Sequence, residues 1–271
     1  MRPAPFKSVF LPKKAVVEKA ARETPQLRSI LLRPDGGMRF QLGQFVMVTA
    51  ADAGEAPFAP SSSADEEETV RITVGKADAV TSRIHALKPG DIVGIRGPYG
   101  KPFSWEPLAG MEIAFAVRGI GLAAARPFIL RAVGMRENFL KITLWTDPAD
   151  ALPHGDDLIS WTGAVHVMRG EEASGSDART NSADFLKRSG LHPERAATFL
   201  FCGRKENRNL ADALFKAGFG PERIFLWTET RMDCAIGQCR RCTLDHLFVC
   251  REGPLMPLAA LSGLSCFRGR P

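Results

Sequence analysis

The stretch MDCAIGQCRRCTLDHLFVC, residues 232–250, holds four of the six cysteines of the chain. Cys234, Cys239 and Cys242 are separated by four and then two residues, and Cys250 follows after seven more. The first gap contains Ala235 and a glycine, small residues that let the backbone turn inward. The spacing therefore predicts one tight loop with its thiols directed to a common centre, and Cys250 on a strand that follows the loop.

Four thiolates at these spacings are typical of a plant-type 2Fe-2S cluster. Structural zinc uses the same ligands, but zinc ribbons pair two C-x-x-C units across a longer gap, and here only Cys239 and Cys242 form such a unit. The spacing favours the cluster and leaves a zinc-stapled interaction protein without a redox role as an alternative. Four arginines near the loop form either a docking rim for an acidic partner or an ordinary solvated surface: Arg231, Arg240, Arg241 and Arg251.

Composition excludes several classes of protein. The 271 residues, 45% of them hydrophobic, suffice for one large or two modest domains. The apolar run at 113–117 is too short for a membrane span, and the N-terminal residues lack the apolar segment of a secretory signal, so we expect no membrane span and a reducing, cytoplasmic location. The net charge of +6 is scattered, which disfavours nucleic-acid binding. No hydrolase or kinase motif is present, so no catalytic constellation is predicted.

The chain preceding the cysteines divides into two parts. Residues 1–108 contain short β-branched runs between turn signals, which predicts a small antiparallel β barrel. Within this part, 56–69 (APFAPSSSADEEET) is predicted to be a loop, and Thr81 and Ser82 are predicted to open a short helix.

Residues 109–229 alternate strand and helix patterns, which predicts an α/β domain with a parallel sheet and ligands at the carboxyl ends of its strands. One predicted helix has the apolar stripe Leu210, Ala213, Leu214 and Ala217, with Gly218 as its C-cap. Residues 230–271 form a cysteine module that is too short to fold without metal.

This order of parts resembles the ferredoxin-NADP reductase superfamily. Within it, the chain is most similar to electron-transfer subunits of the sulfhydrogenase gamma, anaerobic sulfite reductase and dihydroorotate dehydrogenase types. The resemblance covers nearly the whole chain, through RETPQLRSILL (22–32), GQFVMV (43–48), GEAPF (54–58), LKPGDIVGIRGPYGKPF (87–103), GIGLA (119–123), FCG (201–203) and residues 230–254.

The resemblance implies a flavin-binding barrel that holds FAD (1–108), an NAD(P)-binding-like α/β domain (109–229) and a 2Fe-2S module (230–271). It implies an oxidoreductase subunit that relays electrons between NAD(P)H, FAD and the 2Fe-2S cluster, to or from a partner catalytic subunit of a larger complex. The alternative is a degenerate family member that no longer binds NAD(P)H and acts as an iron-sulfur wire or docking subunit.

The resemblance also implies flavin-binding residues: Phe58, Thr81, Ser82, Gly97, Pro98, Tyr99 and Gly100. The residues at 97–100 are also compatible with a plain β-turn, and Thr81 with a simple helix cap. The Arg-x-aromatic-Ser motif of the superfamily reads Ala56-Pro57-Phe58-Ala59 here, so its phosphate-binding arginine and its serine hydroxyl are both missing.

For the nicotinamide nucleotide, the resemblance implies Gly119, Gly121, Cys202 and Gly203. The Gly-Gly-x-Gly-x-Ala-Pro motif of the family becomes RGIGLAA at 118–124, and its Cys-Gly-Pro becomes CGR at 202–204. Arginine thus stands where the family has the first glycine and again where it has the proline. The two glycines are also what a tight strand-to-helix turn requires.

Overall fold

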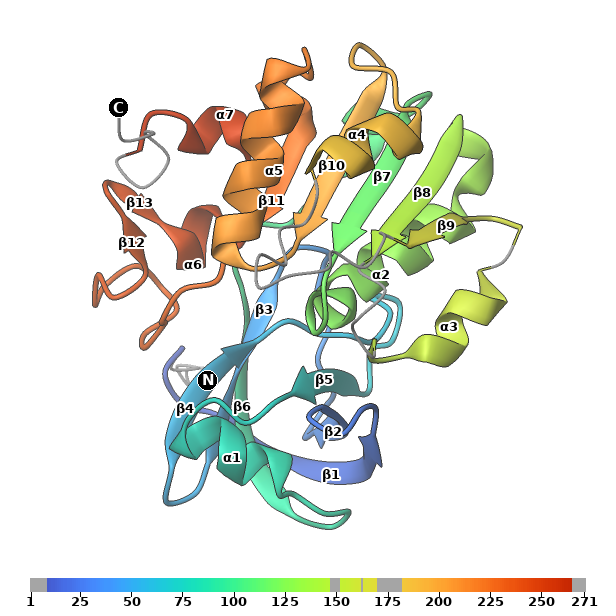
Figure 1. Cartoon of the computed structure of the whole chain (residues 1–271). Helices are drawn as coiled ribbons and strands as arrows, with labels where there is room; N and C mark the ends of the chain where they lie inside the picture. The colour runs from blue at the N-terminus through green and yellow to red at the C-terminus, as the bar shows by residue number, and fades with distance from the viewer. Residues whose placement is uncertain (1–8, 147–151, 162, 170–181, 265–271) are drawn as a thin grey trace, which may run out of the picture.

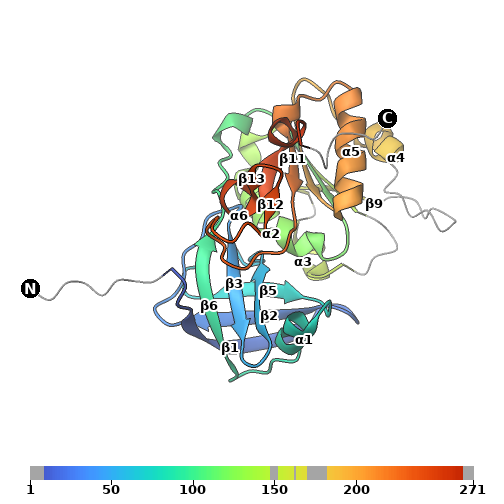
Figure 2. The ribbon, with the colours of Figure 1, turned by 90° about the vertical axis from the view of Figure 1, so that its left-hand side faces the viewer.

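The computed structural model describes residues 9–146, 152–161, 163–169 and 182–264. In Figure 1 an antiparallel barrel lies below a mainly parallel sheet, and the cysteine-rich segment lies at the side where the two meet. Figure 2, turned by 90°, shows that segment against both parts. No helix in these ranges is long and apolar enough to cross a membrane.

The barrel is a six-stranded antiparallel sheet with the order β4-β3-β6-β1-β2-β5. Its strands are β1 (Lys13–Arg22), β2 (Arg28–Pro34), β3 (Phe45–Ala50), β4 (Gly54–Phe58), β5 (Val70–Val74) and β6 (Ile92–Tyr99). The chain after β4 returns to β5, where the Ser61 N–H donates to the Arg71 carbonyl at 2.7 Å. This contact brings together the two edges of the sheet, which confirms the predicted barrel.

Two local predictions in the barrel were wrong. The predicted loop 56–69 begins inside β4, where Pro57 pairs with Met47 of β3. Gly54 and Pro57 are poor strand formers, and the strand forms because β3 supplies its hydrogen-bond partners. The helix α1 (Ala79–His85) starts two residues before Thr81, because the Asp78 side chain caps it.

The second sheet has the order β14-β11-β10-β7-β8-β9, and all its strands except β14 are parallel. They are β7 (Glu112–Val117), β8 (Lys141–Thr146), β9 (His166–Arg169), β10 (Ala196–Phe201), β11 (Ile224–Trp227) and β14 (Leu255–Pro257). The helices are α2 (Gly121–Gly134), α3 (Gly155–Ser160), α4 (Ser182–Ser189) and α5 (Arg204–Lys216), with 3-10 turns at Glu106–Leu108, Arg136–Asn138 and Pro221–Arg223. This sheet confirms the predicted α/β fold class.

Both faces of the second sheet are buried, because successive side chains of a strand point to opposite faces. In β7, Ala114 and Ala116 pack on the side of α4 and α5, while Phe115 packs on the side of α2. On the α2 side, Phe103 of the segment after β6 packs edge-on against Phe199 of β10, with ring centroids 5.4 Å apart. The linker between barrel and sheet is therefore anchored in the core.

The predicted stripe of α5 was half wrong. Leu210 and Leu214 are buried as expected, but the other two buried positions are Asn207 and Ala211, rather than Ala213 and Ala217. Asn207 was missed because it is polar. It is buried because its amide accepts the Cys202 N–H and donates to the Trp227 carbonyl, both at 2.9 Å. At the other end Gly218 (φ +92°) follows the cap Ala217, and the Phe219 N–H donates to the Leu214 carbonyl as in a Schellman motif.

The cysteine-rich segment contains a two-stranded ribbon, β12 (Thr243–Leu244) and β13 (Leu247–Phe248), then α6 (Val249–Glu252), β14 and α7 (Leu258–Leu261). The prediction that Cys250 lies on a strand was wrong, since it lies in α6. Strand β14 pairs antiparallel with β11, so this segment extends the second sheet. The predicted boundaries after 108 and 229 stay predictions, and 1–8 and 265–271 lie outside the described residues, as do 147–151, 162 and 170–181.

A buried polar network joins the barrel to the second sheet. His154, before α3, has its Nε2 3.0 Å from the Thr73 Oγ1 of β5, and its backbone N–H donates to the Glu23 carboxylate at 2.9 Å. Beside it, Arg126 of α2 pairs with Asp157 at 2.5 Å and donates to the Ser61 carbonyl of the barrel at 2.6 Å. The network thus joins the barrel to the second sheet through side chains that include the titratable groups of His154 and Glu23.

Burial lowers the pKa of His154, although the Glu23 carboxylate beside it acts in the other direction, and Arg126, Asp157 and Arg71 also face it. A histidine kept neutral in the folded state takes up a proton more readily in the unfolded state, so stability falls as the pH drops below about 6.5.

We expect protonation linked to His154 to lower the free energy of unfolding by about 1 kcal/mol between about pH 7.5 and about pH 5.5. In His154→Asn, which tolerates the left-handed φ of 58° at this position, this loss should disappear. Urea denaturation at the two pH values measures it, with His166→Asn, an exposed histidine on β9, as the control. An equal pH dependence in wild type and His154→Asn would contradict this assignment.

Candidate functional site

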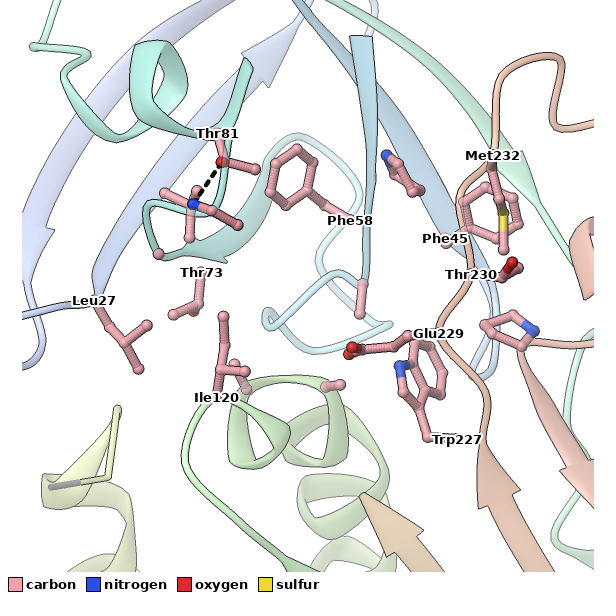
Figure 3. A pocket seen from close by; sticks show the side chains of 18 of the residues that line it. Leu27, Phe45, Phe58, Thr73, Thr81, Ile120, Trp227, Glu229, Thr230 and Met232 are labelled. Carbon is pink, nitrogen blue, oxygen red and sulfur yellow. Dashed lines mark hydrogen bonds between the residues drawn. The ribbon is translucent and has the colours of Figure 1, made fainter. Parts of the chain in front are cut away.

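A cavity of about 710 Å³ lies where the three parts of the chain meet (Figure 3). The barrel lines it with residues of β3, β4 and the β5–α1 region, the second sheet with α2 and the end of β11, and the cysteine-rich segment with Met232. Its size is within the range of small-molecule sites, roughly 300–1,000 Å³. Phe45 and Phe58 contribute aromatic rings from the barrel and Trp227 one from β11, so much of the lining is apolar.

The seven predicted flavin residues, all described, divide between two regions. Phe58 and Thr81 line the cavity, and Ser82 lies one residue further along α1, outside the lining. Residues 97–100 lie beyond Phe45, whose ring centroid is 5.8 Å from that of Tyr99. Gly97 and Pro98 line a separate groove on the barrel. Gly100 (φ +90°) has no room for a side chain, since a Cβ atom there would lie 2.7 Å from the Gly253 carbonyl oxygen.

The N-terminus of α1 is closed by its own side chains. The Asp78 carboxylate accepts the Thr81 N–H at 2.8 Å, and the Thr81 hydroxyl accepts the N–H groups of Ala77 and Asp78, each at 2.9 Å. The backbone N–H and the side chain of Thr81 lower the pKa of Asp78. A negative charge thus occupies the helix end at which Thr81 and Ser82 were predicted to bind the flavin.

Lys76 offers a different contact for a phosphate. Among the described residues that line the cavity, it alone carries a positive charge. It lies between β5 and α1, close in the chain to Thr81. The superfamily arginine is absent at position 56, and Lys76 supplies a positive charge to the lining of the cavity. The cavity therefore combines an aromatic, apolar middle, which fits a flavin, with one cation, Lys76, and two carboxylates, Asp78 and Glu229.

Glu229 was not predicted as a site residue, and it lines the cavity beside Trp227 (Figure 3). Burial raises the pKa of its carboxyl group, against the effects of Trp227 and Arg204. The residue is nevertheless exposed, and it lines the cavity. The Arg204 guanidinium donates to the Glu229 carbonyl at 2.8 Å, so it ties the start of α5 to this segment.

The predicted nicotinamide residues gather at the carboxyl ends of the paired strands β7 and β10. Gly119 has a φ of +48°, and a Cβ on Gly121 would lie 1.7 Å from the Phe201 carbonyl oxygen. Cys202 is half-buried and follows β10, and Gly203 is the N-cap position of α5. Gly119 and Gly121 are thus required by the fold, and their turn contains Ile120, which lines the cavity.

Arg118, which replaces the first glycine of the family motif, is directed to α5. Its side chain is 25% exposed and its Nη1 lies 3.9 Å from the Glu206 carboxylate. This ion pair links the end of β7 to α5, beside the residues predicted for the nicotinamide nucleotide.

The four loop cysteines lie close to one another. The Cys234 thiol is within hydrogen-bonding reach of Cys239, and the Cys250 thiol is within reach of Cys242. Cys242 and Cys250 are each 1% exposed, whereas Cys239 is exposed. In the described ranges, no three His, Cys, Asp or Glu side chains converge as a lone metal ion would require. The thiols thus lie near one another on one loop, as the ligands of a two-iron cluster must.

Backbone N–H groups point at the sulfurs. Gly237 donates to the Cys250 Sγ at 3.1 Å, and Gln238 and Cys239 donate to the Cys234 Sγ at 3.3 Å. Burial alone would raise the pKa of Cys234, but the N–H groups of the loop and the Cys239 side chain lower it to about 7. Burial and the neighbouring Cys242 raise the pKa of Cys250 to about 12. The loop thus stabilises negative charge on its exposed side.

The loop geometry depends on left-handed backbone. Ala235 (φ 63°), Gly237 (φ 81°) and Arg240 (φ 60°) all have positive φ. The inward turn predicted from Ala235 and the glycine is therefore present, although Ala235 adopts this conformation with a Cβ atom, at a cost of roughly 1–2 kcal/mol.

Comparison with known proteins connects these features. Residues 14–104 match the family model of the oxidoreductase FAD-binding domain, and residues 229–262 match that of the iron-sulfur cluster binding domain of dihydroorotate dehydrogenase B. A probable dihydroorotate dehydrogenase B (NAD(+)) electron transfer subunit from Pyrococcus furiosus is 30% identical over 219 residues, which cover 80% of each chain. The chain belongs to this family of electron-transfer subunits.

Two further proteins are similar to this chain over most of their length. Sulfhydrogenase 1 subunit gamma of Pyrococcus furiosus is 28% identical over 233 residues, which cover 80% of this chain and 78% of the relative. The solved structure of an NADH-dependent reduced ferredoxin-NADP oxidoreductase is similar in fold, with a TM-score of 0.72, 18% identity, and coverage of 93% of this chain and 90% of the other. The predicted family and the three-part fold class are confirmed. The individual site residues stay predictions.

Four residues near the cavity were missed from the sequence: Lys76, Asp78, Trp227 and Glu229. The pair Lys76 and Asp78 carried a signal, since a lysine and a helix-capping aspartate follow a strand there. Trp227 and Glu229 carried none, because only the approach of β11 to the barrel places them at the cavity.

We expect Lys76→Gln to weaken FAD binding about tenfold, because a charge-assisted hydrogen bond to a phosphate is lost. The dissociation constant is measured by flavin fluorescence on re-addition of FAD to stripped protein. Lys88→Gln removes an exposed lysine of the same barrel that does not line the cavity, and should bind FAD as wild type does. Equal affinities of the Lys76 and Lys88 variants would show that Lys76 holds no phosphate.

Proposed function

We propose that this chain is the electron-transfer subunit of a multi-subunit oxidoreductase, which relays electrons between NAD(P)H, FAD and a 2Fe-2S cluster to or from a partner protein. Bound FAD would exchange a hydride with a nicotinamide and pass electrons singly to a cluster. The chain supplies the cavity for the flavin, the turns at β7 and β10 for the nucleotide, and the four thiols for the cluster: Cys234, Cys239, Cys242 and Cys250.

The observation that carries the proposal is the contact between cavity and cysteine loop. Met232 lines the cavity, and Cys234 follows it by two residues. Phe45 also lines the cavity and belongs to the same packed apolar cluster as Cys242 and Cys250. A flavin in the cavity would therefore be separated from the loop by few side chains.

The partner would dock at the exposed side of the loop. Cys239 is exposed, and Arg231 and Arg241, whose side chains are 76% and 62% exposed, flank Asp233 at 3.4 Å. The excess of arginine suits an acidic partner surface. A cytoplasmic location is part of the proposal, because thiols must remain reduced to bind iron.

We expect protein purified without oxygen to contain two irons and one FAD per chain and no stoichiometric zinc. Absorption spectra with iron, zinc and flavin analysis measure this. The double variant Cys242→Ser/Cys250→Ser is the matched control, and it should lose the iron and its absorbance while it keeps FAD. A colourless, iron-free wild-type preparation would contradict the cluster and favour the zinc-stapled alternative.

The nucleotide step is tested separately, because the ion pair between Arg118 and Glu206 occupies the family's nucleotide turn. Addition of NADH or NADPH to the FAD-loaded protein without oxygen should bleach the flavin absorbance. If neither nucleotide bleaches bound FAD and dithionite does, the chain is an iron-sulfur wire that takes its electrons from another protein.

A further inference from the structure

One side chain of the barrel, that of Arg96, is hydrogen-bonded directly to the backbone of the cysteine loop. Arg96 lies on β6, opposite Met47 of β3, and its side chain is 5% exposed. Paired residues of antiparallel strands point to the same face, and Met47 packs outward with the apolar cluster that contains Cys242 and Cys250. Arg96 therefore leaves the barrel on the side that the loop covers.

All five N–H groups of the Arg96 guanidinium have acceptors. Two of them donate to the Glu55 carboxylate of β4, and the one from Nε does so at 2.8 Å. A third donates to the Tyr99 hydroxyl at 3.2 Å. The other two donate to the loop backbone, to the Asp233 carbonyl at 2.7 Å and to the Cys234 carbonyl at 2.9 Å. The Tyr99 ring also lies against the cation, 5.4 Å from its centre.

These contacts hold the loop at its turning point. The carbonyl bound by Arg96 belongs to the peptide between Cys234 and Ala235, and Ala235 has the unfavourable φ of 63°. A rigid, planar fork that binds two successive carbonyls fixes the direction of the chain there. The backbone of Cys234 is thus hydrogen-bonded to the barrel, whereas Cys250 lies in helix α6 of the cysteine-rich segment itself.

The same hydrogen bonds place the positive charge of Arg96 near the loop that carries the thiols. The guanidinium lies between the loop backbone and Glu55, so its positive charge is on the side of Cys234 and the carboxylate is behind it. A cluster gains one negative charge on reduction, and positive charge nearby favours that state.

We propose that Arg96 is a positioning residue for electron transfer. It fastens the Cys234 end of the loop to the flavin-binding barrel, and with Glu55 it sets the reduction potential of the cluster and the rate at which an electron crosses from flavin to cluster. This inference rests on the proposed function, since it assumes that both cofactors bind. One electron leaves the reduced flavin and reduces the oxidised cluster.

The test is a redox titration of the loaded protein followed by electron paramagnetic resonance. In Arg96→Gln the cluster should become harder to reduce, by about tenfold in the equilibrium with flavin, which is about 59 mV for one electron. In Glu55→Gln it should become easier to reduce. A merely loosened structure would not shift the potential in opposite directions.

Two further variants separate geometry from charge. Arg96→Lys keeps the charge and loses the planar fork, so the potential should remain near wild type while amide hydrogen exchange at residues 233–236 and the flavin-to-cluster rate change at least threefold. Arg33→Gln is the matched control, because Arg33 pairs with Glu18 and Glu68 on the same barrel. It should leave the potential, the spectrum and the exchange unchanged.

Unchanged potentials in Arg96→Gln and Glu55→Gln, or shifts of the same sign, would overturn the inference. If Arg96→Gln does not fold, Glu55→Gln and Arg96→Lys decide it through potential and exchange. A wild-type protein without flavin or cluster would refute the proposed function and this inference together, whereas a loaded protein with unaffected variants would refute the inference alone.

Discussion

The outer face of β3 and β6 carries the contact on which the rest of this molecule depends. The inner face of the same strands closes the barrel, with Val46 and Ile95 in its core. The outer face turns Phe45 and Met47 into the packed cluster that holds Cys242 and Cys250. A strand with both faces buried fixes the register of everything attached to it, because a slip by one residue would exchange its two faces. The flavin cavity and the cysteine loop are therefore held on one rigid element.

The buried charge of Arg96 makes this contact directional as well as strong. Apolar packing tolerates small shifts, but the Arg96 guanidinium has five donors in one plane and satisfies them only in one arrangement of Glu55, Tyr99 and the loop. A charge removed from water and then deprived of a partner is strongly destabilising, commonly by about 3–5 kcal/mol. The loop thus has one favourable position on the barrel, which suits a group that must stay at a constant distance from the flavin.

The departures from the family motifs become understandable at the cavity. The missing arginine at position 56 is accompanied by Lys76 on the neighbouring strand end, and the α1 N-terminus is closed by Asp78. Arg118 has an ionic partner in Glu206 of α5. Two of the departures, at positions 56 and 118, are thus accompanied by a charged side chain in the surrounding structure.

Pattern and spacing predicted the strands of the barrel, the parallel sheet and the cysteine loop, because periodic burial and ligand spacing are local properties of a chain. They did not predict β4, because Pro57 and Gly54 make a strand only when β3 is beside them. Asn207 was missed for a similar reason, since a polar residue is buried in α5 only where Cys202 and Trp227 offer partners. Cys250 was assigned to a strand because the single turn α6 is too short to show helical periodicity.

The sequence by itself determined the chemistry of this protein: four cysteines at x4, x2 and x7 spacing, glycines at the turns of an α/β domain, and family resemblance over nearly the whole chain. Tertiary structure alone decided where that chemistry lies. It brought Cys234 close to Cys239 and Cys250 close to Cys242, placed Trp227 and Glu229 on a cavity shared with the barrel, and hydrogen-bonded Arg96 to residues more than a hundred positions away. Ligand type and spacing are written in neighbouring residues, whereas distance and charge across a site arise only when remote segments pack together.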